Sequence, residues 1–314
     1  MLNNEQIAHH YSGIGGSMAA SILGVNKYQS NVEAYLLLTD EEYRKEKQRS
    51  LSDKLQIEIG NMLESLVAKH IQIEKGWKLV EPTGTLIDPE YPFLKGHPDR
   101  LIENNGGLIE IKTRGRFGER EYGEEGTDQI QDGEYIQMQH YFMLTGLKSG
   151  WLCALMLGDS QIKYFLIERH EGVIAAIREN CVEFWNNHVI PKIPPKILKY
   201  DDAASVWQRS ISFERLAGDE IIRLAKEIKE HKRLIKHHAE ELDPKQARIA
   251  EFLNEADTLV DGDYNKILTW KTQETNRIDL DLLRSKYSDI ALELTNKTTS
   301  RVMRFNKKWG DNNE

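Results

Sequence analysis

The sequence predicts an α/β fold with a mixed central sheet flanked by helices, followed by a C-terminal α+β appendage. Up to about residue 200, segments with helical spacing of apolar residues alternate with short runs of strand character. From about residue 210 a highly charged helical run begins, and Pro191–Pro195 before it holds three prolines in five residues, which forbids helix and suits a linker. We therefore expect a first domain over residues 1–200 and a C-terminal domain of helices and a β-hairpin over residues 201–314.

Helices and strands of the first domain follow from the spacing of apolar residues and from glycine signals. Gly13–Gly16 leads into the first helix, and the apolar residues of Leu55–Lys75 recur at helical spacing until Gly76 ends that helix. The predicted elements are, in order, helices Ser17–Leu23, Asn31–Leu38 and Leu55–Lys75; strands Thr83–Ile87, Phe93–Glu103 and Gly107–Arg114; helix Tyr135–Thr145; strands Trp151–Leu157 and Lys163–Glu168; and helix Glu171–His188.

The C-terminal domain is predicted from the same signals. Phe213–His238 and Asp243–Leu253 are expected to be charged helices, Tyr264–Thr272 and Ser300–Phe305 strands, and Leu280–Tyr287 a helix between these strands. No catalytic pattern occurs in this domain.

Composition limits the function classes. The net charge of −8 argues against a protein that coats DNA non-specifically, because such binding rests on many Lys and Arg contacts to phosphate. It does not exclude an enzyme that holds DNA locally, since bound metal ions would offset the acidic residues of a site. The two cysteines, Cys153 and Cys181, are too few for an iron–sulfur cluster and are expected to be reduced.

A cytoplasmic protein is expected from the N-terminus and from the hydropathy. The sequence has no run of eighteen apolar residues, so we expect no membrane-spanning helix. Its first six residues lack the basic-then-apolar pattern of a signal peptide.

One strand–turn–strand segment carries chemistry-bearing residues. If Asn104 and Asn105 form a two-residue hairpin loop, Asp99 lies directly opposite Glu110. Alternation along the second strand then puts Glu110 and Lys112 on one face and Ile109 and Ile111 on the other. Cross-strand neighbours sit roughly 5 Å apart, and two carboxylates so close in a half-buried place repel each other strongly.

A divalent cation would relieve this repulsion, since Mg²⁺ takes one or two carboxylates and keeps several waters. Asp99 and Glu110 are the expected ligands, with the backbone carbonyl of Ile111 as a further one. The metal would polarise a scissile phosphate, while Lys112 would orient the attacking water or stabilise developing charge. Glu64, on the long helix, is a candidate for a second metal.

Interpretations without a catalytic role stay open for these residues. An Asp, ten residues and then Glu-x-Lys arises by chance in many proteins of this length. Glu110 and Lys112 could form a solvated strand face, and Glu64 alone could be a surface residue of its helix. Residues 113–134 are rich in glycine and charge, and would suit either a flap over DNA, in which Arg114 contacts phosphates, or an ordinary solvent loop.

Five ordered motifs resemble the YqaJ viral recombinase family, related to lambda exonuclease, over roughly residues 10–170. The matching segments are Ile14–Asn26, Gly60–Glu64, Gly96–Arg100 with Glu110–Thr113, Gly123–Ile130, and Tyr135–His140 with Thr145–Gly146. The resemblance implies a restriction-endonuclease-like core of the PD-(D/E)xK type and two Mg²⁺ or Mn²⁺ ions. It implies digestion of double-stranded DNA from 5′ to 3′, which leaves a 3′ single strand. It also implies a ring-shaped homo-oligomer, with a trimer favoured, and a single-strand annealing recombinase as partner.

Site residues follow from the same resemblance. Asp99, Glu110 and Lys112 match its catalytic residues, and Gln139, with Gln137 as a second choice, matches a supporting position near metals and substrate. Ser17 matches the position that binds the terminal 5′ phosphate. The glycine-rich approach through Gly16 would leave free backbone N–H groups for a phosphate, although Ser17 as a plain N-cap is the simpler reading.

Three positions depart from the family pattern. Met18 replaces the common Asp after the serine, His10 stands where Arg is frequent, and Gln131 replaces the usual Pro. These departures bear on 5′-phosphate anchoring more than on catalysis. Two other functions remain alternatives: a structure-specific endonuclease on the same core, and a catalytically idle DNA-binding or assembly protein.

Overall fold

The structure is a computed structural model, and it describes residues 11–52, 55–104, 106–115, 118–210, 212–275, 279–293, 295, 301–306 and 309. The chain divides into two compact units, Met1–Val206 and Trp207–Glu314. His10 and Asn105, on which parts of the sequence analysis rest, lie outside the described residues.

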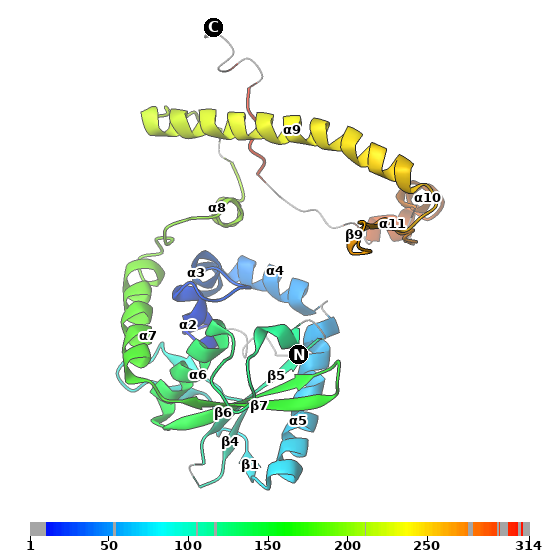
Figure 1. The fold of residues 1–314 in the computed structure, drawn as a ribbon. Helices are drawn as coiled ribbons and strands as arrows, with labels where there is room; N and C mark the ends of the chain where they lie inside the picture. The colour runs from blue at the N-terminus through cyan, green and yellow to red at the C-terminus, as the bar shows by residue number, and fades with distance from the viewer. Residues whose placement is uncertain are drawn as a thin grey trace. The chain divides into compact units, whose positions relative to one another are not determined.

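The first unit is built on a five-stranded mixed sheet (Figure 1). Its strands lie in the order β1 (Leu79–Val80), β4 (Arg100–Ile102), β5 (Leu108–Arg114), β6 (Ser149–Met156) and β7 (Gln161–Glu168). Only the β5–β6 pair is parallel; the other three pairs are antiparallel. A parallel pair needs a crossover connection, which here contains helix α6 (Asp132–Thr145).

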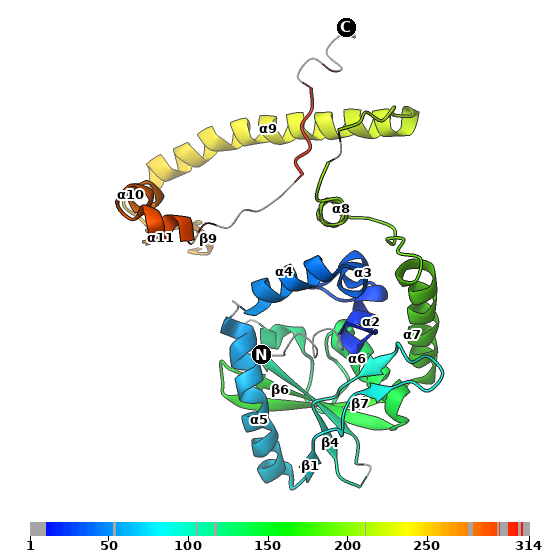
Figure 2. The same cartoon turned by 180° about the vertical axis from the view of Figure 1, so that it is seen from behind.

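Helices cover both faces of this sheet (Figure 2). Helix α5 (Leu55–Lys75) packs on one face, where Val67, Ala68 and Ile71 contact Ile109 and Ile111 of β5. The other face is covered by α2 (Gly16–Ile22), α6 and α7 (Glu171–Phe184), which form the largest apolar core. The predicted α/β fold, with a mixed central sheet flanked by helices, is confirmed.

The strand predicted at Phe93–Glu103 is wrong in one respect, because the structure splits it in two. β3 (Lys95–Gly96) pairs with β2 (Leu86–Ile87) in a separate ribbon, whereas β4 joins the central sheet. Pro98 stands between them and has no N–H to donate to a ladder. The split frees Asp99 from regular strand pairing at the edge of β4.

Most other elements of the first unit lie where they were predicted, and Leu55–Lys75 has the predicted bounds. The strand at Thr83–Ile87 shortens to Leu86–Ile87, and the last predicted helix continues past α7 as a π-helical turn, Trp185–Val189. The sequence did not predict helix α4 (Glu41–Ser52), helix α8 (Tyr200–Val206) or strand β1. Helix α3 itself spans Asn31–Thr39.

The division between units falls after Val206, whereas the predicted boundary follows residue 200. Helix α8 belongs to the first unit because Asp202 is buried there and accepts a hydrogen bond from Ser30 Oγ at 2.7 Å. The proline-rich Pro191–Pro195 therefore lies inside the first unit and does not link the two units.

The second unit contains one 35-residue helix, α9 (Asp219–Leu253). Two helices were predicted, but α9 continues through Pro244 because strong helix formers flank it on both sides. A hairpin follows, β8 (Thr258–Val260) with β9 (Lys266–Thr269), then α10 (Leu280–Lys286) and α11 (Ser288–Glu293). The strand predicted at Ser300–Phe305 is wrong: residues 301–306 have no regular structure, and Ser300 lies outside the described residues.

Within the described part of the chain, no helix combines the length and hydropathy needed to cross a bilayer.

Candidate active site

The β4–β5 hairpin has the predicted register. Arg100 pairs with Ile109 and Leu101 with Leu108, so continuation of the register places Asp99 opposite Glu110. Asn104 has a φ of 65°, the left-handed conformation that the tight turn requires. The two acidic residues therefore meet across the hairpin.

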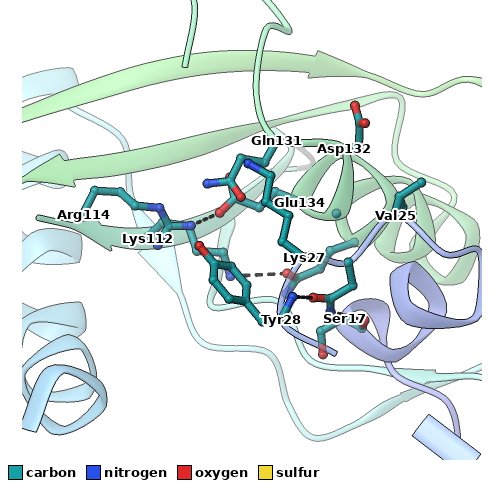
Figure 3. Close-up of a pocket in the computed structure, with 12 residues that line it drawn as sticks. Ser17, Val25, Lys27, Tyr28, Lys112, Arg114, Gln131, Asp132 and Glu134 are labelled. Atoms are coloured by element: carbon teal, nitrogen blue, oxygen red, sulfur yellow. Dashed lines mark hydrogen bonds and ion pairs between the residues drawn. The ribbon is translucent and has the colours of Figure 1, made fainter. Parts of the chain in front are cut away.

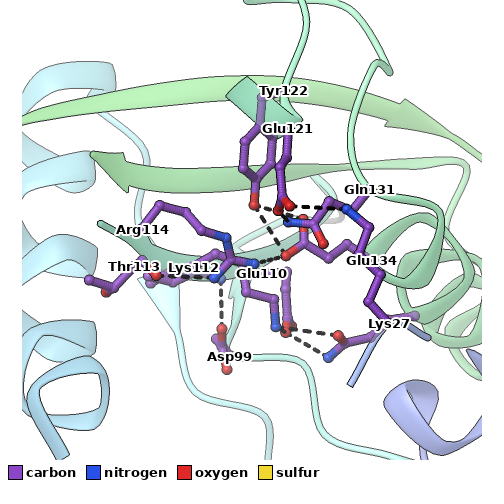
Figure 4. A network of polar contacts seen from close by, with 12 residues as sticks. Lys27, Asp99, Glu110, Lys112, Thr113, Arg114, Glu121, Tyr122, Gln131 and Glu134 are labelled. Carbon is purple, nitrogen blue, oxygen red and sulfur yellow. Dashed lines mark hydrogen bonds and ion pairs between the residues drawn. The ribbon is translucent and has the colours of Figure 1, made fainter. Parts of the chain in front are cut away.

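Asp99 is held at this position by the neighbouring strand. Its Oδ2 accepts a hydrogen bond from the backbone N–H of Ile111 at 2.6 Å (Figure 4). Burial and the negative charge of Glu110 raise the pKa of Asp99 to about 8, although the Ile111 bond opposes the shift. A carboxyl group in this state is strongly repelled by its neighbour's charge.

Glu110 is only 3% exposed, and its two carboxylate oxygens have different surroundings. Its Oε1 accepts hydrogen bonds from Lys112 Nζ and from Gln137 Nε2, both at 2.6 Å. Its Oε2 is buried with no hydrogen bond among the described residues. Leaving such an atom unsatisfied costs about 1–3 kcal/mol or more, so the site has an unmet requirement for a positive or donor group.

A divalent cation fits this requirement. Asp99 and the free oxygen of Glu110 offer two carboxylates, the backbone carbonyl of Ile111 lies next to them in sequence, and hard cations prefer such oxygen ligands. The part of the chain that the structure describes contains no group of three or more His, Cys, Asp or Glu side chains suited to a metal. The donor set therefore suits an ion such as Mg²⁺, which accepts two carboxylates and completes its shell with water.

Lys112 stays charged beside Glu110. Burial alone would lower the pKa of Lys112, but the charge and hydrogen bond of Glu110 outweigh it and raise that pKa. Lys112 Nζ also lies 3.3 Å from Gln137 Oε1. A fixed ammonium group thus stands beside the paired acids, on the face of β5 that the sequence predicted.

Gln137, rather than Gln139, reaches the site, which corrects the sequence-based preference. Gln137 bonds both Glu110 and Lys112, and its Nε2 also donates to Tyr141 Oη at 2.9 Å. Gln139 is fully buried and instead joins backbone groups, donating to Glu168 O at 2.7 Å and accepting from His170 N at 2.8 Å. Residues two positions apart on a helix point to different sides, so only one of the pair can serve the site.

Glu64 forms an ion pair with Arg100 Nη1 at 2.8 Å, so the structure does not place it as a direct ligand beside Asp99. Its charge contributes to the raised pKa of Asp99, which shows that it lies within electrostatic reach. His140 is also buried near the site, with Nε2 2.7 Å from Lys95 O, and burial lowers its pKa to about 4. It is a neutral packing residue, as is common for such histidines.

A pocket of about 300 Å³ opens beside Lys112 and brings three helical and strand segments together (Figure 3). Ser17 of α2, Lys112 and Arg114 of β5 and Gln137 of α6 all line it. Gly16 is buried, and a Cβ there would lie 2.8 Å from Gln137 Cγ. The absence of a side chain at Gly16 therefore lets α2 approach α6 closely. The sequence thus predicted Ser17 and Lys112 separately, and the structure unites them in one concave surface.

The sequence analysis did not identify Lys27 and Tyr28, which also line the pocket. Lys27 forms an ion pair with Glu121 at 3.1 Å. No local pattern singles out these residues, because they follow the N-terminal motif and reach the pocket only through the turn after α2. The position of Lys27 directly after the N-terminal motif was the one signal in the sequence that could have pointed to the pocket.

The loop between β5 and α6 is held against the sheet by several contacts. Tyr122 stacks on Phe165 with ring centroids 5.2 Å apart, and Gly126 N donates to Tyr164 O at 2.8 Å. Lys163 Nζ lies 2.5 Å from Glu119. These contacts favour a docked loop over a free solvent loop.

Together, the mixed sheet between helices and the hairpin that sets Asp99 opposite Glu110, beside Lys112, have the arrangement that the sequence analysis expected of a PD-(D/E)xK site. Residues 7–148 match the model of the YqaJ-like viral recombinase domain. The resemblance seen in the sequence motifs is thereby confirmed.

Several known proteins are similar to this chain. "Uncharacterized protein YqaJ" of Bacillus subtilis (strain 168) is 28% identical over 310 residues, which cover 96% of this chain and 93% of that protein. An alkaline exonuclease from Laribacter hongkongensis is similar at 21% identity and a TM-score of 0.46, covering 61% of this chain and 94% of its own. A phage related exonuclease from Haemophilus somnus 129PT has 19% identity and a TM-score of 0.41, covering 58% and 96%.

Proposed function

We propose that this protein is a metal-dependent deoxyribonuclease that digests double-stranded DNA from its 5′ ends and leaves 3′ single-stranded tails for phage-type recombination. The observation that carries the proposal is the Asp99–Glu110 pair, with one buried carboxylate oxygen unpartnered beside a charged lysine. Buried polar atoms are usually hydrogen-bonded, so an unpartnered carboxylate oxygen next to a second acid supports a site that takes a cation. The YqaJ-like domain supports the recombination setting.

Asp99, Glu110 and the Ile111 carbonyl would hold Mg²⁺ or Mn²⁺. A bound ion of this kind polarises a scissile phosphate and makes a water easier to deprotonate. Two ions per site belong to the proposal, and the described residues supply direct carboxylate ligands for one of them. Glu64 would reach a second ion only after release from Arg100 or through water.

The protein's own side chains supply the remaining chemistry. Lys112, fixed by Glu110 and Gln137, would stabilise the negative charge that develops on the phosphate as water attacks. Gln137 positions both Glu110 and Lys112 through its amide. Preorganised donors of this kind contribute more than mobile ones, because no reorganisation is needed during the reaction.

Ser17 lies on the same pocket as Lys112, which supports its proposed contact with the terminal 5′ phosphate. An end held there would place a nearby phosphodiester at Lys112 and the two acids. A ring-shaped homo-oligomer, with a trimer favoured, around the duplex and a single-strand annealing recombinase that receives the tail complete the proposal, which locates the protein in the bacterial cytoplasm.

The test is digestion of linear duplexes that carry a 5′ phosphate or a 5′ hydroxyl, with Mg²⁺ or with EDTA. We expect Mg²⁺-dependent loss of nucleotides from the 5′ end, no cleavage by Asp99→Ala or Lys112→Ala, and a weaker 5′-phosphate preference in Ser17→Ala. Covalently closed circular DNA is the control, because an exonuclease needs an end. Cleavage of the circle would favour an endonuclease, and undiminished activity of Asp99→Ala would remove the mechanism.

A further inference from the structure

A second buried acid–base group lies beside the Lys112–Glu110 pair. It consists of Arg114 on β5, Glu134 in the first turn of α6, and Tyr122 in the docked loop between them. Glu134 is 7% exposed, which is rare for a glutamate unless it is paired. No part of the proposed chemistry described above uses this carboxylate.

Glu134 binds two neighbours through both of its oxygens. Arg114 Nη2 donates to Oε1, and Tyr122 Oη lies 3.1 Å from Oε1 and 2.8 Å from Oε2 (Figure 4). The N-terminus of α6 adds a favourable field for a negative charge. A buried carboxylate so placed fixes the groups that bind it.

Arg114 is oriented by these contacts. Its Nη1 donates to Thr113 O at 3.0 Å, and its guanidinium lies 5.8 Å from the Tyr122 ring centroid. A Cβ on Gly118 would lie 3.0 Å from Arg114 Cδ, so the loop covers the aliphatic stem. Its Nε is buried and has no partner among the residues that the structure describes, which indicates that Glu134 sets the orientation at some cost to the guanidinium.

The guanidinium still borders the pocket. Arg114 and Glu134 line the same pocket as Lys112 and Ser17, and the Arg114 side chain is 22% exposed. Arg114 has five N–H donors, and the contacts described above use only two of them. Since the Nε donor is buried, two Nη donors remain for a ligand while the bond to Glu134 persists.

Lys112 and Arg114 form a short row of cations. They are two positions apart on one strand, so both project from the same face, about 7 Å apart along the strand. That step is comparable to the separation of successive phosphates along one DNA strand. The row continues from the proposed catalytic lysine along the pocket, where a strand leaving the site would lie.

We propose that Glu134 is a positioning residue that holds Arg114 against the phosphate next to the scissile one. The inference rests on the proposed function, because it takes the pocket to bind a DNA strand. Arg114 gains affinity for phosphate when its fork is already oriented, since less side-chain freedom is lost on binding. Tyr122 supports the carboxylate and ties this orientation to docking of the loop.

The test measures binding, so it does not depend on cleavage. Dissociation constants for a short 5′-phosphorylated duplex are measured in EDTA at several NaCl concentrations by fluorescence anisotropy. The variants are Arg114→Ala, Glu134→Ala, Glu134→Gln and the double variant Arg114→Ala with Glu134→Ala. Lys78→Ala with Glu103→Ala is the matched control, because it removes an exposed ion pair near the hairpin turn, at the other end of β4 from Asp99.

We expect Arg114→Ala and Glu134→Ala each to raise the dissociation constant on the order of tenfold and to lower the salt slope by about 0.9, the value of one phosphate contact. The double variant should bind like Arg114→Ala alone, because Glu134 acts through Arg114. Glu134→Gln keeps the shape and an acceptor oxygen, so it should recover part of the lost affinity. The control should bind like wild type.

Tighter binding by Glu134→Ala would show that the carboxylate only neutralises Arg114, and an added loss in the double variant would show that it acts elsewhere; either result overturns the inference. If Glu134→Ala fails to fold, Glu134→Gln in the wild-type and Arg114→Ala backgrounds gives the same comparison. A wild-type protein that shows this coupling but never cleaves linear DNA would refute the proposed function and leave the positioning role standing.

Discussion

Gln137 and Gln139 stand two positions apart on α6, and the structure gives them unrelated surroundings. Gln137 joins Glu110, Lys112 and Tyr141 at the candidate site, whereas Gln139 joins α6 to the backbone at Glu168 and His170. The first arrangement supports chemistry, and the second connects the end of β7 to the start of α7.

Substitution of each glutamine by alanine separates these roles. We expect Gln137→Ala to reduce nuclease activity by about 10–100-fold with little change in stability, because it removes a group that orients Glu110 and Lys112. Gln139→Ala should lower the free energy of unfolding by about 2–4 kcal/mol, since two buried backbone groups lose their partners. Urea unfolding and activity per folded molecule measure the two effects. Equal losses of activity in both variants would contradict the assignment.

Much of the site could be predicted from residue types and spacing, for a physical reason. A hairpin turn and strand alternation are local, so the facing of Asp99 and Glu110, with Lys112 on the same side, follows from counting residues. Which of Gln137 and Gln139 reaches the site could not be predicted from local sequence. It depends on how α6 is rotated against the sheet, and a buried glutamine resembles a functional one in sequence.

Helices α2 and α6 approach each other closely, and this approach forms the pocket. Gly16 lies where a Cβ would meet Gln137, whereas a Cβ on Gly15 would meet no atom within 4 Å. Both glycines were seen in the sequence as one glycine-rich approach to a phosphate, and only the packing distinguishes them.

Gly15 and Gly16 therefore form a matched pair for mutation. Gly16→Ala should destabilise the protein by about 1–3 kcal/mol through overpacking and should lower activity, because it displaces Gln137. Gly15→Ala should change the free energy of unfolding by less than about 0.5 kcal/mol. Thermal unfolding and the duplex digestion assay measure both; a larger loss in Gly15→Ala than in Gly16→Ala would refute the packing explanation.

The whole molecule distributes its apolar core unevenly between the two units. All three clusters of buried apolar residues lie in the first unit, and among the described residues of the second unit only Leu253 is buried. The proline signal placed the predicted boundary a little early, because a sequence cannot show that α8 docks through Ser30 and Asp202.

Limited proteolysis tests this distribution. We expect the first cuts within residues 207–218, where the described residues form no helix or strand, followed by loss of the second unit and survival of a fragment that ends near Val206. Mass spectrometry of the digestion course identifies the ends. Earlier cuts inside β5, β6 or α6 would contradict the expected stability of the first unit.

The tight turn at Asn104 has a consequence for how this protein can diverge. The two acids meet because an equal number of residues separates each from the turn. Their facing therefore depends on the number of residues between them and not on which residues form the turn. Side chains in the turn can be exchanged while that length is kept. Gain or loss of one residue there would turn one acid to the opposite side of the sheet. Relatives that keep the chemistry should therefore vary in the residue types of this turn more readily than in its length.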